Sequence, residues 1–189
     1  MVRQRAGPEG APARRQYARS FQTLPRARRA IANRAALAEE CLELGKFTEA
    51  EYHYERILAL PMGDDPIYAF GRARAQFGRS HPGEAVATLD DLRKRWPNYQ
   101  SVDAHLFYAR ALEESGRTDD ALYEYQAVAD YYPGAEARVR YGLLLSKAGR
   151  TDEAKAAFRE VLTGLKRAPK YVRRVQAVIL PLAVHGCLG

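Results

Sequence analysis

Many features of common functional sites are missing from this 189-residue sequence. Its two cysteines, Cys41 and Cys187, lie too far apart in the chain for a zinc or redox motif and are too few for a secreted disulfide framework. Its four histidines occur singly, without the helically spaced pair that zinc enzymes use. Glycine-rich phosphate loops and GxSxG elements are also missing. We therefore expect no metal, no cofactor and no enzymatic activity.

Long apolar runs are missing as well. No stretch reaches the length of about 18 apolar residues that a transmembrane helix needs, and the basic start has no apolar segment behind it, which argues against a secretory signal. The composition, with 47% hydrophobic and 28% charged residues, is typical of a globular protein. We expect a cytoplasmic or peripherally membrane-associated protein.

Acidic residues are almost missing from the first part of the chain. Residues 1–34 hold nine arginines and one acid, a charge of +8, so that residues 35–189 carry only −1 of the net +7. We expect residues 1–25 to be a disordered tail with a short helix at its end. This tail could dock the protein on anionic lipid or nucleic acid, follow a membrane anchor in a longer protein, or only keep the chain soluble.

What the sequence does contain is a repeat with a period near 34 residues. Four alanines, Ala50, Ala85, Ala121 and Ala154, recur at spacings of 35, 36 and 33. Each alanine follows a glycine that we expect to end a helix. The alanine comes five residues after the glycine in three of the repeats and seven residues after it in the second repeat. Such a period predicts a solenoid of helix pairs. The helix-ending glycines are Gly45, Gly78, Gly116 and Gly149, and small residues lie midway along each first helix at Ala38, Gly71, Ala109 and Gly142.

With these residues in register, the segments resemble tetratricopeptide repeats. The resemblance also rests on an aromatic or aliphatic pair after each alanine, such as Tyr125 and Val128, and on prolines that close three of the units. It implies an all-α, right-handed helical-repeat solenoid with four helix pairs at about 26–63, 64–101, 102–134 and 135–166. A capping helix and an apolar tail are expected over 167–189.

The pattern makes specific predictions about packing. The small residue of a first helix should meet the alanine of the second where the two helices cross. Thr118 and Thr151 should cap their helices, and Pro82 should occupy a first turn. The two extra residues of the second repeat should lengthen the turn between its helices. His105 lies on a packing stripe, where a buried, hydrogen-bonded histidine is the expected state.

The resemblance implies that the first helices line a concave groove that binds a protein or peptide. Aromatic and arginine side chains in such a groove can anchor a partner and bind its carboxylates. The alternative is that these arginines pair with acids such as Asp65, Asp103 and Glu136 and bind nothing. The expected groove residues are Glu39, Glu43, Tyr68, Arg72, Gln76, Phe107, Arg110, Glu114, Arg140, Leu143 and Lys147.

One known partner class is disfavoured. Chaperone-binding members of the family clamp a terminal carboxylate with lysines, asparagines and an arginine, whereas Ala35, Glu39, Ala69, Asp103 and Phe107 occupy those positions in this sequence. The sequence therefore predicts a non-enzymatic interaction scaffold for another extended or helical segment. Docking of the Arg-rich tail on a membrane or on nucleic acid is the alternative function.

Overall fold

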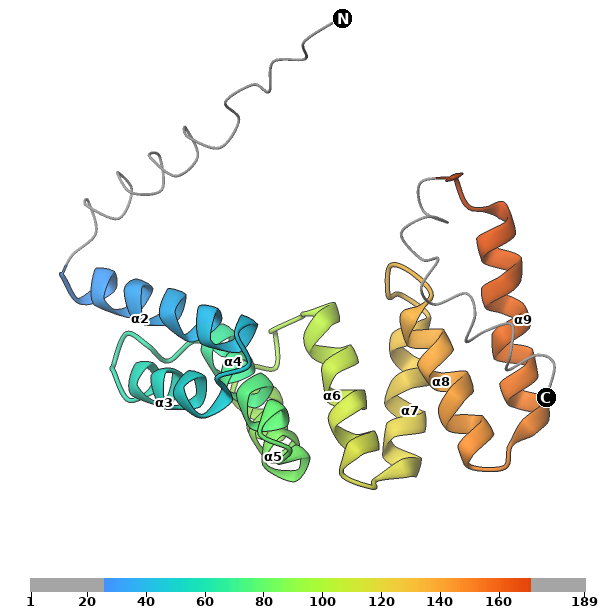
Figure 1. The fold of residues 1–189 in the computed structure, drawn as a ribbon, viewed down its shortest axis with the longest axis horizontal. Helices are drawn as coiled ribbons and strands as arrows, with labels where there is room; N and C mark the ends of the chain where they lie inside the picture. Colours follow the sequence, from blue (N-terminus) through green and yellow to red (C-terminus); the bar gives the residue numbers. More distant parts are fainter. Residues whose placement is uncertain (1–25, 171–189) are drawn as a thin grey trace, which may run out of the picture. The chain divides into compact units, whose positions relative to one another are not determined.

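The computed structural model describes residues 26–170, and these residues form eight α-helices and no strand (Figure 1). The Arg-rich tail, residues 1–25, and residues 171–189 of the expected cap lie outside the described residues. No helix among the described residues is long and apolar enough to cross a membrane. The helices are α2 (Arg26–Glu43), α3 (Phe47–Leu58), α4 (Pro66–Gly78), α5 (Pro82–Arg95), α6 (Val102–Glu114), α7 (Thr118–Ala129), α8 (Glu136–Lys147) and α9 (Thr151–Arg167).

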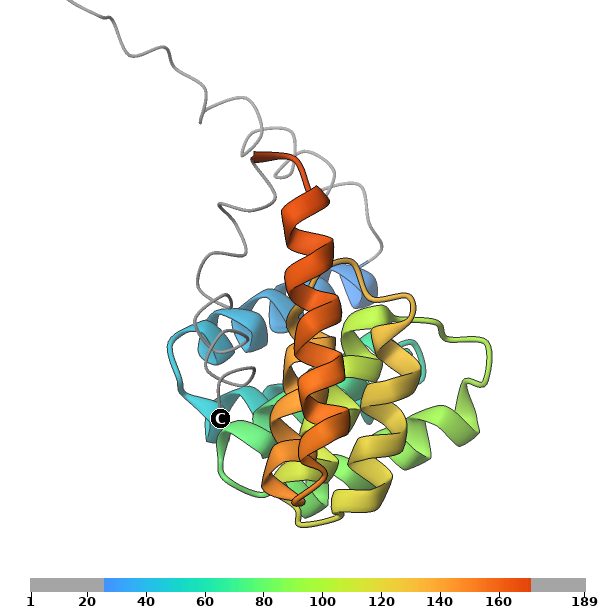
Figure 2. The same cartoon turned by 90° about the vertical axis from the view of Figure 1, so that its right-hand side faces the viewer.

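The helices belong to two compact units, and the boundary falls inside α4, between Ala75 and Gln76. In the first unit α2 packs against α3. In the second unit each helix from α5 to α9 packs against the next one in the chain (Figure 1). Figure 2 shows the second unit from its α9 end, with α9 in front of α7 and α8. The predicted all-α helical-repeat fold is confirmed.

The core of the first unit is built around Tyr54 and Ile57 of α3. Ala38 of α2 and Ala50 of α3 belong to the same core and are completely buried. Gly71 of α4 leaves room for the Tyr54 ring, because a Cβ atom at this position would lie 2.4 Å from the ring carbon Cζ. The Tyr54 hydroxyl in turn donates a hydrogen bond of 2.8 Å to Glu39 of α2. The small residue, the ring and the carboxylate thus hold three helices together.

The second unit also packs small residues against large rings, here between α8 and α9. Ala109 and Ala121 are completely buried, and the largest fully buried side chains include Tyr125 and Phe158. A Cβ atom at Gly142 would lie 2.8 Å from the Phe158 ring. Dense packing of this kind explains why these positions hold alanine or glycine.

The turns between paired helices correct one prediction. Gly45, Gly116 and Gly149 have positive φ angles of 72°, 79° and 77°, which is the left-handed conformation that glycine adopts most easily. In the second helix pair the left-handed residue is Ser80, with φ 63°, whereas Gly78 is the last residue of α4. The second helix pair therefore contains no two-residue insertion, since α4 has 13 residues, as α6 does. With Ser80 in the place of the glycine, the five-residue spacing to the next alanine holds in all four helix pairs.

The hydrogen bonds of these turns agree with that assignment. The His81 N–H donates to the Gln76 carbonyl at 3.0 Å, as the Arg117 N–H donates to the Leu112 carbonyl at 3.0 Å. Both bonds close the helix C-terminus in the manner of a Schellman motif. A serine in the left-handed region costs about 1 kcal/mol relative to glycine.

The predicted threonine caps are wrong. Thr118 and Thr151 are the first residues of α7 and α9, and the N-cap positions belong to Arg117 and Arg150, whose side chains make no capping hydrogen bond. Each arginine instead forms an ion pair with the acid three residues later, at 2.8 Å for Asp120 and 2.6 Å for Glu153. Pro82 does occupy the first turn of α5, as predicted.

Candidate functional site

The expected groove residues divide between the two units. Glu39, Glu43, Tyr68 and Arg72 belong to the first unit. In the second unit Phe107, Arg110 and Glu114 lie on α6, and Arg140, Leu143 and Lys147 lie on α8, while Gln76 lies near the end of α4.

In the first unit two of the predicted groove residues, Arg72 and Glu39, are engaged within the protein, whereas Glu43 is exposed. Arg72 forms ion pairs with Glu55 at 3.0 Å and with Glu51 at 3.9 Å. Glu39 accepts hydrogen bonds from Arg74 at 2.7 Å and from Tyr54 at 2.8 Å. Burial alone would raise the pKa of the Glu39 carboxyl, but the hydrogen bonds from Arg74 and Tyr54 outweigh burial and lower it. These contacts stabilise the helix packing.

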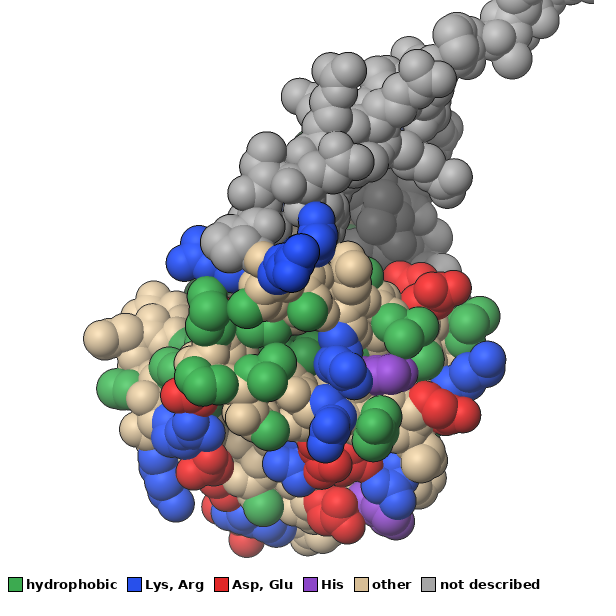
Figure 3. Space-filling model, turned by 90° about the vertical axis from the view of Figure 1, so that its left-hand side faces the viewer, with side chains coloured by type: hydrophobic (Ala, Val, Ile, Leu, Met, Phe, Trp, Pro, Cys, Tyr) green, Lys and Arg blue, Asp and Glu red, His purple; other side chains and the backbone are tan. Residues whose placement is uncertain are grey.

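The first unit also exposes large hydrophobic side chains. Figure 3 shows one face of the molecule on which hydrophobic side chains gather while acidic and basic side chains are interspersed. The exposed hydrophobic residues of this unit are Leu37, Leu44, Tyr52, Leu60, Met62 and Ile67.

The second unit presents Arg110 in a different environment. Its guanidinium carbon lies 5.5 Å from the centre of the Phe77 ring and 5.7 Å from the centre of the Phe107 ring. The two rings contact each other edge to face, with their centres 5.1 Å apart. Among the described residues no carboxylate lies within ion-pair distance of Arg110. The aromatic rings hold this cation without neutralising it.

The predicted groove cations of α8, Arg140 and Lys147, are paired with acidic side chains. Arg140 donates to Glu136 at 2.9 Å, which is one of the pairings that the alternative interpretation named. Lys147 bonds to Glu113 at 2.9 Å, and the Tyr125 hydroxyl donates to the other oxygen of Glu113 at 2.8 Å. Burial raises the pKa of the Tyr125 hydroxyl, and the neighbouring Glu113 carboxylate raises it further. Glu113 therefore connects α6 to both α7 and α8.

The prediction for Gln76 is wrong, because only 2% of this residue is exposed. Its side-chain oxygen accepts a hydrogen bond of 2.8 Å from the Thr88 hydroxyl of α5. A side chain that is this deeply buried is not accessible to a partner. The side-chain amide of Gln76 bonds α4 to α5. The spacing of residues along α4 alone does not distinguish this role from exposure in a groove.

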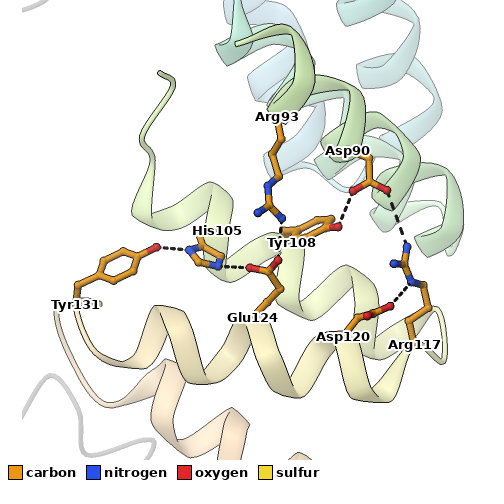
Figure 4. Close-up of polar contacts among 8 residues, drawn as sticks. All are labelled: Asp90, Arg93, His105, Tyr108, Arg117, Asp120, Glu124 and Tyr131. Carbon is orange, nitrogen blue, oxygen red and sulfur yellow. Dashed lines mark hydrogen bonds and ion pairs between the residues drawn. The ribbon is translucent and has the colours of Figure 1, made fainter. Parts of the chain in front are cut away.

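A polar cluster in the second unit was not predicted from the sequence (Figure 4). Its centre is Glu124 of α7, which is 8% exposed. Glu124 accepts hydrogen bonds from Arg93 of α5 at 2.8 Å and from His105 of α6 at 2.5 Å, and His105 also contacts the Tyr131 hydroxyl. Burial alone would raise the pKa of the Glu124 carboxyl, but the bonds from His105 and Arg93 outweigh burial and lower it.

The same cluster continues along α5 and α7. The Tyr108 hydroxyl donates to Asp90 at 2.5 Å, and Arg117 lies 3.9 Å from Asp90 (Figure 4). The Arg93 guanidinium also stacks over the Tyr108 ring, 4.9 Å from its centre. Burial and, to a smaller extent, the neighbouring Asp90 together raise the pKa of Tyr108 to about 12. Because its members bond to one another, the cluster fastens α5, α6 and α7 together.

The sequence held only a weak signal for this cluster. His105 was expected to be a buried, hydrogen-bonded histidine; it is hydrogen-bonded to Glu124 but only partly buried, with 23% of its side chain exposed. Its partner Glu124 is separated from it by 19 residues, and Arg93 is separated from Glu124 by 31. A glutamate in the middle of an amphipathic helix is usually solvated, so only its place beside the buried Tyr125 could have indicated burial.

Two of the clefts among residues 26–170 lie in the second unit, and neither of these two is lined by the expected groove residues. The larger one, about 580 Å³, lies beside the polar cluster, between α5, the loop after it and the start of α6. The smaller one, about 290 Å³, lies between α7, α8 and α9 and is lined by Arg138, Tyr141 and Glu153 among others. Within residues 26–170, no group of three or more metal-binding side chains comes together.

Paired helices with small residues at their crossings define a helical-repeat protein. A family model described as tetratricopeptide repeat matches residues 70–136 and 109–171, which together cover more than half of the chain. The chain therefore belongs to the tetratricopeptide repeat family, whose members generally mediate protein–protein interactions. Among curated proteins, no relative matches the sequence.

Solved structures show the same fold. TTC0263, a thermophilic tetratricopeptide repeat protein of Thermus thermophilus, is 20% identical, and the match covers 92% of this chain and 88% of that one with a TM-score of 0.64. MamA of Desulfovibrio magneticus RS-1, from residue 41 to its end, is 18% identical over 82% of this chain and 90% of its own, with a TM-score of 0.64. A tetratricopeptide repeat protein of Parabacteroides merdae ATCC 43184 is 16% identical, covers 82% of this chain and 60% of that one, and has a TM-score of 0.61.

Proposed function

We propose that this protein is a non-enzymatic interaction scaffold that binds a carboxylate-bearing segment of a partner protein across α6 and α8. The observation that carries the proposal is the state of Arg110. Its guanidinium is stacked on Phe77 and Phe107 and has no acidic partner among the described residues. An arginine held in this way is ready to bind a carboxylate with two parallel hydrogen bonds.

Preorganisation strengthens such a contact. A flexible arginine loses rotamer freedom when it binds, and the two rings already restrict the Arg110 side chain. Phe107, whose ring contacts both Phe77 and Arg110, is half-buried. Aromatic and arginine residues of this kind are the usual anchors of protein interfaces.

The neighbouring side chains would support the contact. Arg140 and Lys147 are held in place by Glu136 and Glu113, so they contribute fixed positive groups at the ends of ion pairs. Leu143, between them on α8, is partly exposed and adds an apolar contact. Glu114 is exposed on α6 and would select against acidic residues next to it. The expected partner is thus a segment with one or two acids beside an apolar residue.

Replacement of Arg110 tests the proposal. Partners are captured by chemical crosslinking and identified by mass spectrometry with the wild-type chain, with Arg110→Glu and with Arg159→Glu. Arg159 is exposed on α9, so its charge reversal is a matched control. We expect Arg110→Glu to lose the captured partner, with at least about a tenfold loss of affinity, and Arg159→Glu to keep it.

Arg110→Lys separates charge from geometry. Lysine retains the positive charge but lacks the planar fork, so partial retention of binding is expected. Equal capture by the wild type and Arg110→Glu would contradict the proposal.

A further inference from the structure

The larger cleft of the second unit has a size and lining that fit a binding site. Its volume of about 580 Å³ lies within the range of about 300–1,000 Å³ that is typical of ligand pockets. Apolar side chains from two helices form part of its walls, namely Leu89 and Leu92 of α5 and Val102 and Ala104 of α6. None of these residues belongs to the α6/α8 surface around Arg110.

Three tyrosines complete the walls. Tyr108 and Tyr131 have partners for their hydroxyl groups in Asp90 and His105, so that their rings, and not unsatisfied polar atoms, line the cleft. Tyr131 is 52% exposed and lies at the mouth, and Tyr99 comes from the loop between α5 and α6. Walls of this kind favour a large apolar or aromatic side chain.

The charge of the cleft indicates the second property of its occupant. None of the lining residues is acidic, and Arg93 is the permanently charged one. Arg93 gives one nitrogen, Nη1, to Glu124 at 2.8 Å, and its side chain is still 56% exposed. A guanidinium has five N–H donors, so Arg93 can bind a further carboxylate at the edge of the cleft.

We propose that this cleft binds a protein segment in which a large apolar side chain stands next to an aspartate or glutamate. The apolar side chain enters between Leu92, Val102 and Tyr131, and the carboxylate bonds to Arg93. The site is independent of the Arg110 surface, so a partner could use either site or both.

The test uses a peptide probe with the full-length protein. The probe is the fluorescein-labelled peptide Gly-Ser-Phe-Asp-Ser-Gly, and its binding is measured by fluorescence anisotropy. We expect a dissociation constant below about 1 mM. Replacing the phenylalanine of the probe by serine should abolish binding, and replacing the aspartate by asparagine should weaken it by about threefold to tenfold. Binding that is equal for all three probes, or absent for all, would overturn the proposal.

Variants of the protein locate the bound probe. Val102→Trp fills the cleft from the half-buried first residue of α6 and should weaken binding by about tenfold or more. Tyr131→Ala removes one wall and should also weaken it, whereas Tyr123→Ala, which removes a 72% exposed tyrosine outside the cleft, should not. Unchanged binding in both Val102→Trp and Tyr131→Ala would contradict the proposed location.

Two further measurements separate this cleft from the Arg110 surface and from self-association. Arg110→Glu should leave probe binding unchanged, so that failure of the cleft and failure of the Arg110 surface are distinguishable. Sedimentation velocity then tests whether a second copy of the chain fills the cleft. A wild-type dimer that Val102→Trp converts to a monomer would show self-association and overturn the proposal of a partner segment.

Discussion

At the scale of single residues, Gly71 shows how little freedom a repeat position can have. The ring of Tyr54 occupies the space that a side chain would need, and the Tyr54 hydroxyl is held by Glu39. The ring therefore cannot move aside without breaking a hydrogen bond. Gly142 makes a similar contact with Phe158, but that ring has no polar tether, so it can adjust more easily.

Replacing Gly71 by alanine should therefore destabilise the protein. Overpacking costs about 1–3 kcal/mol, and the better helix propensity of alanine returns up to about 1 kcal/mol. We expect a net loss of about 1–2 kcal/mol in the free energy of unfolding, measured by urea denaturation. Gly164→Ala is the control, because a Cβ atom there meets nothing within 4 Å in α9. It should be neutral or slightly stabilising, and equal effects of the two substitutions would mean that the Tyr54 ring does not restrict position 71.

At the scale of elements, Glu113 links three helices. Its carboxylate lies on α6 and accepts hydrogen bonds from Tyr125 of α7 and Lys147 of α8. Only 16% of its side chain is exposed, so its partners lose a largely buried acceptor when it is removed. Its neighbour Glu114 is exposed. Two adjacent acids of the same helix thus have different tasks.

Glu113→Ala should lower the free energy of unfolding by about 1–3 kcal/mol, because a buried tyrosine hydroxyl loses a charged acceptor. Glu114→Ala is the matched control and should stay within about 0.5 kcal/mol of the wild type. Thermal unfolding followed by circular dichroism measures both. If the Glu113→Ala protein were as stable as the Glu114→Ala protein, the bonds of Glu113 to α7 and α8 would contribute nothing to the free energy of unfolding.

The element scale also shows what the sequence could predict. Helix pairs and three left-handed glycines followed from a repeated local pattern, because each depends on residues within one turn or one period. The nearest neighbour of Gly71 did not follow from it, because that neighbour is Tyr54 of α3. The position of Ser80 was missed because Gly78 lies two residues before it, and local spacing does not show that Gly78 still belongs to the last turn of α4. The Arg72 ion pairs with Glu51 and Glu55 and the burial of Gln76 depend on how neighbouring helices pack, and the sequence pattern does not specify that.

At the scale of the whole molecule, each compact unit contains a carboxylate whose pKa is lowered in the folded state. In the first unit it is Glu39, where bonds from Arg74 and Tyr54 outweigh burial, and in the second it is Glu124, where bonds from His105 and Arg93 do so. A carboxyl with a lowered folded pKa stabilises the protein above its unfolded pKa, near 4.5. That stabilisation is lost as the pH falls from there through the folded value.

Both units should therefore lose stability below about pH 4.5. The melting temperature, followed by circular dichroism, should be nearly constant from neutral pH down to that point and then fall. Glu124→Gln cannot titrate, so its melting temperature should be lower than that of the wild type at neutral pH and should fall less on acidification. The remaining decrease should become smaller still in the double variant with Glu39→Gln, because the two carboxylates belong to separate units. Parallel melting curves for the wild type and both variants across this range would contradict the assignment of acid sensitivity to these two groups.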